Sequence, residues 1–159
     1  MFSDFPNLHP LVVHFPIVLI LLSAALQGLL IFKDSQQLRW GTLIIMGAAF
    51  VSAVVSSKIF HAHITELPPL ANQIYQDHER YSDYTLWISG LTFLFRGIGE
   101  FYQIQRRSYE GLVLASALVA AVFLSLTGHR GAQLVYLEGV GPQGNLVTRE
   151  GQEHGATAE

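Results

Sequence analysis

Histidine is the residue type in this chain that most directly suggests a chemical function. The sequence has seven histidines and no cysteine, and imidazole ligates haem iron, binds divalent metal ions and titrates near neutral pH. His14 lies near the start of one long apolar stretch, and His61 ends a second. His78 precedes a third stretch and His129 follows a fourth. Each stretch therefore places one imidazole near one of its ends.

These four apolar stretches each have about the length of a membrane-spanning helix. They run from about residue 11 to 32, 40 to 60, 81 to 102 and 111 to 128, and a helix needs about 20 mostly apolar residues to cross a bilayer. Inside lipid the backbone groups must pair within the segment, which requires helices. Because the first and last connections are short, neighbouring helices run antiparallel. The sequence thus predicts an all-α membrane protein, an antiparallel four-helix transmembrane bundle with four imidazoles near one membrane level.

The composition supports this class and excludes others. Half of the residues are hydrophobic and 13% are charged, against about 25% in a typical soluble domain. The net charge of −3 argues against a nucleic-acid partner, which requires a basic face. Without cysteine the chain has no disulfide, no thiolate ligand and no attachment point for c-type haem. No nucleophile triad or phosphate loop is present, so we expect an electron-transfer or accessory subunit rather than a stand-alone enzyme.

Turn-forming residues mark the boundaries of these elements. Pro68-Pro69 should break any helix before them, so the third helix can begin directly afterwards. Gly128 and Gly131 flank the last of the four histidines and predict a sharp turn, followed by a short C-terminal interfacial segment that covers the histidine end. We expect residues 1–141 to form the transmembrane domain and residues 142–159 to form a polar, flexible tail.

The charge distribution predicts the orientation of the bundle. The end with the two short connections has a net charge of +2, and the end with both termini has a net charge of −5. Basic residues next to membrane spans favour the cytoplasmic side. We therefore expect a multi-pass protein of the bacterial inner (plasma) membrane with both termini in the periplasm, and the histidines at the periplasmic end.

Helical spacing also arranges small and polar residues in rows that lead to these histidines. One row comprises Ala117, Ala121, Ser125 and His129, and another comprises Ala49, Ala53, Ser57 and His61. The third helix has a polar face made of His78, Ser82, Thr85, Ser89, Thr92 and Arg96. Rows of small residues allow membrane helices to pack closely, and they could equally leave space beside an imidazole for a porphyrin.

The first candidate site is one for haem b. Two imidazoles on facing helices can ligate one iron, and we expect His14 and His78 to be the axial ligands, with His129 the next candidate. Arg80 and Arg130 could pair with the haem propionates.

Three other functions fit the same residues. The three histidines together with Glu79 could bind zinc, copper or non-haem iron. The polar face of the third helix could line a path for protons or ions. The chain could also be a structural subunit of a larger membrane complex, without a cofactor of its own.

Four short motifs carry a resemblance to other proteins. They are HPLVVHFP at residues 9–16, the pair His78-Glu79, TGHRG at residues 127–131, and LVY with GVG at residues 134–141. Together they resemble a family of predicted four-span bacterial membrane proteins of uncharacterised function. The resemblance adds His9 to the favoured residues, whereas His61 and His63 match none of its motifs.

The resemblance also implies redox partners, because relatives are fused to c-type cytochrome or rubredoxin-like modules. We therefore expect a periplasm-side histidine-lined site that binds haem b for electron transfer. The expected partners are membrane lipid and a quinone, a periplasmic redox protein or a larger membrane complex.

Overall fold

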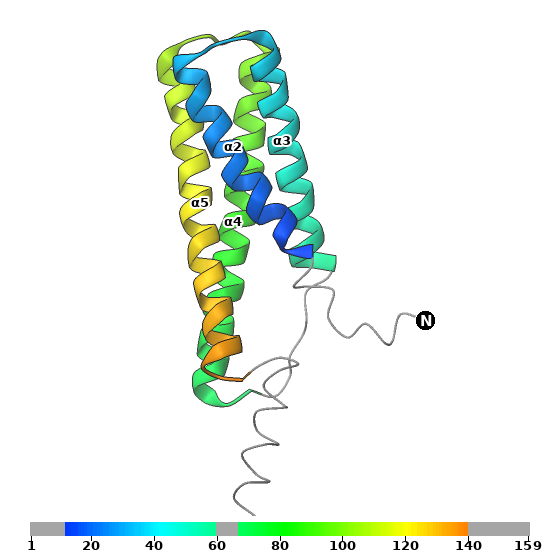
Figure 1. The fold of residues 1–159 in the computed structure, drawn as a ribbon, viewed down its shortest axis with the longest axis vertical. Coiled ribbons are helices and arrows are strands. Elements are labelled where there is room, and N and C mark those ends of the chain that lie inside the picture. Colours follow the sequence, from blue (N-terminus) through cyan, green and yellow to red (C-terminus); the bar gives the residue numbers. More distant parts are fainter. Residues whose placement is uncertain (1–11, 60–66, 140–159) are drawn as a thin grey trace, which may run out of the picture.

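The computed structural model describes residues 12–59 and 67–139, which form a bundle of four long helices (Figure 1). The helices are α2 (His14–Phe32), α3 (Gln36–Val54), α4 (Pro69–Phe101) and α5 (Arg107–Tyr136), and a π-helical turn, η1 (Val55–Ile59), extends α3. No strand occurs in these two ranges. The predicted all-α four-helix bundle is confirmed.

Successive helices run antiparallel around a ring (Figure 1). The most extensive packing is between α4 and α5, while α2 packs on α3 and α5, and α3 also packs on α4. The pairs α2 with α4 and α3 with α5 therefore lie across the bundle from each other. The short α2–α3 and α4–α5 connections lie at one end, at the top of Figure 1.

Three helices are long and apolar enough to cross a membrane: α2, the α3–η1 unit and α5. The distribution of side chains explains why α4 differs from them. Its buried residues include Thr85, Ser89, Thr92 and Arg96, whereas Trp87, Leu91 and Leu94 are exposed. The polar face that was predicted on this helix is therefore inside the bundle. Polar residues inside and apolar residues outside are the arrangement expected where lipid surrounds the helices.

The middle of the bundle is packed through small side chains. Ile20, Ala49 and Ala120 form a buried cluster from three helices. On α5 the buried alanines are Ala117 and Ala120, while Ser125 is exposed. The α5 row predicted from four-residue spacing therefore turns away from the bundle after its first members, because 3.6 residues per turn rotate such a row around the helix.

The two helix boundaries predicted from prolines and glycines have opposite outcomes. The third helix, α4, begins at Pro69, which is the early start that the proline pair allowed and well before the apolar stretch at residue 81. The predicted turn at Gly128 and Gly131 is wrong, because α5 continues through both to Tyr136. A glycine inside a helix costs about 1 kcal/mol relative to alanine, yet the helix continues past both and buries Leu134 near its end. The segment expected at the interface is thus the last part of α5.

Candidate functional site

The best-defined histidine is His78, which is half-buried on α4 and faces α5. Its Nδ1 lies 2.9 Å from the backbone carbonyl oxygen of Thr127. A carbonyl can only accept a hydrogen bond, so this contact selects the tautomer in which Nδ1 carries the proton. In that tautomer the lone pair that could ligate a metal is on Nε2.

Gly131 allows the imidazole to lie this close to α5. A Cβ atom added at Gly131 would lie 3.2 Å from Cε1 and 3.3 Å from Nδ1 of His78. Both separations are shorter than an ordinary van der Waals contact, so a side chain at this position would require the His78 ring to shift by a few tenths of an ångström. The glycine that was expected to turn the chain instead makes space for the histidine.

The structure places His14 and His129 at the same end of the bundle as His78, but on exposed positions. His129 is two residues from both Thr127 and Gly131, so it projects from nearly the opposite side of α5. Ile20 and Ala120 belong to the buried cluster in the middle of the bundle. At 1.5 Å per residue, His14 lies about 9 Å along α2 from Ile20, and His129 lies about 13.5 Å along α5 from Ala120. The three rings share one end of the bundle, but they do not converge inside it.

The two arginines that were predicted beside this site, Arg80 and Arg130, form ion pairs with Asp77. Arg130 Nη2 lies 3.4 Å from Asp77 Oδ2, and Arg80 Nη1 lies 3.9 Å from Asp77 Oδ1. Arg130 also donates a hydrogen bond to Gln133 at 2.8 Å, while Glu79 is half-buried. Within residues 12–59 and 67–139, no group of three or more His, Asp or Glu side chains could hold a metal ion. His9, His61 and His63 lie outside the described residues.

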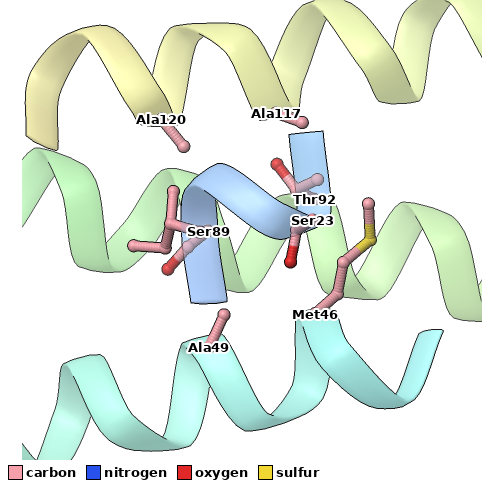
Figure 2. A pocket seen from close by; sticks show the side chains of 8 residues that line it. Ser23, Met46, Ala49, Ser89, Thr92, Ala117 and Ala120 are labelled. Carbon is pink, nitrogen blue, oxygen red and sulfur yellow. The ribbon is translucent and has the colours of Figure 1, made fainter. Parts of the chain in front are cut away.

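A small cavity lies at the centre of the bundle (Figure 2). Its volume is about 10 Å³, which is enough for at most one water molecule. Figure 2 shows side chains from all four helices around it, including Ser23, Ser89 and Thr92. A porphyrin does not fit here, so any haem site must lie toward the end of the bundle.

One polar residue from each helix converges at the opposite end, next to the short connections. They are Gln27 on α2, Arg39 on α3, Arg96 on α4 and Glu110 on α5, and none is more than 6% exposed. Arg96 Nη1 donates to both carboxylate oxygens of Glu110, at 3.0 and 2.9 Å. Gln27 Nε2 donates to Glu110 Oε2 at 2.7 Å, and Arg39 Nη1 donates to Glu110 Oε1 at 3.3 Å. We call these four residues the Arg–Glu cluster.

Two further carboxylates, Glu100 and Asp34, bind the two arginines of the cluster. Arg96 Nη2 binds Glu100 at 3.0 Å, and Arg39 Nε binds Asp34 at 2.6 Å. The hydrogen bond from Arg39 lowers the pKa of Asp34, which lies in the α2–α3 connection. Both arginines thus bridge two carboxylates each. Two atoms, Gln27 Oε1 and Arg96 Nε, are buried without a hydrogen-bond partner in the described part of the chain.

The Arg–Glu cluster was not predicted as a site. Its signal in the sequence was the presence of Arg96 and Glu100 within an otherwise apolar stretch, and of Gln27 within another. Ionisable residues within membrane helices almost always face the interior of a bundle, and this rule could have singled out Arg96. The convergence of four helices on Glu110 required the structure.

The fold and these two polar ends identify the class of the protein. It is a helical membrane protein with a buried ionic cluster at one end and histidines at the other. The chain belongs to the family described as "Predicted membrane protein (DUF2231)", which matches residues 6–144. This agrees with the resemblance seen in the sequence. No curated protein and no solved structure shows a match to the chain.

Proposed function

We propose that this protein binds haem b at its histidine end and transfers electrons across or along the bacterial inner membrane. The observation that supports the proposal is the hydrogen bond between His78 and the Thr127 carbonyl. Histidines that ligate a metal usually donate their other ring N–H to a carbonyl or carboxylate, which fixes the tautomer and the orientation of the ring. The residues of α5 hold His78 in this way.

Haem suits the described residues better than a metal ion bound by side chains alone. A haem iron needs one or two imidazoles, whereas a protein-bound zinc ion needs three or four ligands, which the described ranges do not assemble. We propose that His78 and His14 would ligate the haem iron, with His129 as the next candidate. Arg80 and Arg130 would pair with the haem propionates. The propionates would then compete with Asp77, with which both arginines form ion pairs. The haem would supply one-electron chemistry, and the quinone pool and an external redox protein are the proposed partners.

The proposal includes four membrane crossings with both termini in the periplasm. α4 has 33 residues, about 50 Å at 1.5 Å per residue, and is longer than the hydrocarbon core. Its polar face is buried, so crossing the bilayer exposes its apolar face to lipid. At the short-connection end, Lys33, Arg106 and Arg107 are exposed, which favours placing that end in the cytoplasm.

The experiment is an absorption spectrum of the chain purified in detergent after expression with a supply of haem. We expect a Soret band in the wild type and its loss or shift in His78→Ala and His14→Ala. Gly131→Ala should perturb the band because it displaces the His78 ring, whereas Gly128→Ala, where an added Cβ has no neighbour within 4 Å, should leave it unchanged. A colourless wild-type protein would rule out haem, and a fixed co-purifying partner would then favour the cofactor-free accessory subunit.

A further inference from the structure

The α4–α5 connection borders an open cavity at the short-connection end. The cavity has a volume of about 590 Å³. Its polar lining is contributed by Gln103, Gln105, Arg106 and Ser108, and its apolar lining includes Ile104 and Leu112. The polar and apolar parts are thus contributed by the same short segment of chain.

At this end of the bundle, the acidic side chains form ion pairs, and several basic side chains do not. The acids here are Asp34, Glu100 and Glu110, and each forms an ion pair with Arg39 or Arg96. Lys33, Arg106 and Arg107 remain exposed, without a carboxylate partner in the described part of the chain. This end of the bundle therefore carries three basic residues whose charge is not neutralised by neighbouring acids, and one of them, Arg106, lines the cavity.

In the four-crossing arrangement proposed above, the cavity lies at the level of the lipid headgroups. It is located between the end of α4 at Phe101 and the start of α5 at Arg107, and α5 is one of the three helices suited to cross a membrane. Phe101 and Tyr102, beside the cavity, are 81% and 69% exposed, and aromatic side chains gather at the boundary between lipid and water.

We propose that this cavity binds the phosphate headgroup of an anionic phospholipid, with Arg106 and Ser108 contacting the phosphate. Arginine suits phosphate because its planar guanidinium presents several donors to the oxygens. Leu112 lies one turn further into α5 than Ser108 and would contact the start of an acyl chain. Basic pockets at the cytoplasmic ends of membrane helices are a recognised form of lipid-headgroup site. The proposal rests on the membrane orientation proposed above and is independent of haem binding, which concerns the other end.

Native mass spectrometry of the detergent-purified chain with added lipid tests the site. We expect the wild type to bind phosphatidylglycerol more tightly than phosphatidylcholine, and Arg106→Gln to weaken phosphatidylglycerol binding roughly fivefold. Lys33→Gln removes the same charge from the same end but does not line the cavity, so it should change binding much less. Both variants alter exposed side chains, and their thermal midpoints in detergent would show that they remain folded.

Three outcomes would overturn the proposal. Equal binding of the two lipids would exclude headgroup recognition by charge. Equal losses in Arg106→Gln and Lys33→Gln would mean that diffuse surface charge attracts the lipid and the cavity does not. Displacement of the lipid by millimolar glycerol 3-phosphate, or binding of that compound without lipid, would assign the phosphate site to a soluble ligand.

Discussion

Arg96 and Glu110 form the most completely buried ion pair in the described part of the chain, with both carboxylate oxygens accepting hydrogen bonds from Nη1 of Arg96 at 3.0 and 2.9 Å. The side chain of Arg96 is fully buried, and that of Glu110 is 7% exposed. Because Gln27 and Arg39 also bind Glu110, this one carboxylate connects α5 to the other three helices. The short-connection end is therefore held together by an ionic network, whereas the middle of the bundle combines an apolar cluster around Ile20, Ala49 and Ala120 with neutral hydroxyl contacts such as the one between Thr92 and Ser116.

Replacement of Glu110 should destabilise the protein strongly. Glu110→Gln leaves two buried guanidinium groups short of a carboxylate, and breaking a buried ion pair costs about 3–5 kcal/mol. We expect a large fall in the thermal midpoint of the detergent-purified protein, measured by the fraction that remains monodisperse after heating. Glu100→Gln is the matched control, because it removes one negative charge beside Arg96, keeps an oxygen that can accept from Nη2, and leaves Glu110 in place. Similar midpoints for wild type and Glu110→Gln would contradict a structural role for the cluster.

The helices could be predicted because their signal is local. Long apolar runs identify α2, α3 and α5, and the proline pair identifies the start of α4 at Pro69. The end of α5 could not be read in the same way, since Gly128 and Gly131 are typical of turns. Only the packing of Gly131 against His78 and the burial of Leu134 explain why the helix continues.

The polar sites were harder to predict because they depend on the rotation of each helix. The sequence correctly assigns His14, His78 and His129 to one end of the bundle, but it does not show that His14 and His129 are exposed. Charged residues near helix ends usually extend to the membrane surface, and this made Arg39 resemble an ordinary flanking residue. Its burial at 5% exposure follows from contacts with Asp34 and with Glu110 on another helix.

The ion pair of Asp34 with Arg39 should give a stability contribution that depends on pH. The pKa of Asp34 is lowered in the folded protein by the hydrogen bond from Arg39. A carboxyl with a lowered folded-state pKa stabilises the protein above its unfolded value of 3.8 and loses this effect as pH falls through the folded value. Because the Asp34 side chain is 50% exposed, its contribution should remain below about 1 kcal/mol.

The measurement compares wild type with Asp34→Asn by thermal unfolding in detergent across a pH series. The wild type should be slightly more stable at pH 7, and the difference should shrink below the unfolded pKa of Asp34. A difference that stays constant into strong acid would mean that the effect of the substitution does not depend on the ionisation of Asp34, and would remove the electrostatic explanation.

Gly99 should not tolerate a side chain, because Tyr109 lies directly on it. A Cβ at Gly99 would lie 2.5 Å from Cε1 of Tyr109, and the hydroxyl of Tyr109 donates to the Phe95 carbonyl, so the ring cannot move without losing that bond. Overpacking of this kind typically costs about 1–3 kcal/mol. Gly111→Ala is the control, since an added Cβ there has no neighbour within 4 Å. We expect a lower thermal midpoint for Gly99→Ala and an equal or higher one for Gly111→Ala. A neutral result at both positions would show that Tyr109 is free to move.

Gln103 is the position where a glycine should stabilise the chain. Its φ of 51° is the one positive value among the non-glycine residues in the described ranges, and such a backbone costs about 1–2 kcal/mol for an L-residue. The backbone N–H of Ile104 donates to Gly99 at 2.8 Å, and that of Gln103 donates to Glu100 at 3.3 Å. This is the Schellman pattern that ends helices, with glutamine at the place that glycine usually occupies.

Gln103→Gly should therefore raise stability by a few tenths to about 1 kcal/mol, because the relief of strain exceeds the added flexibility of the unfolded chain. The thermal midpoint of the detergent-purified variant measures this gain. Gln105→Gly, two residues further along the same connection and without a positive φ, is the matched control and should be neutral or destabilising. If both glycines lowered the midpoint equally, chain flexibility would dominate, and the left-handed conformation at residue 103 would impose no measurable strain.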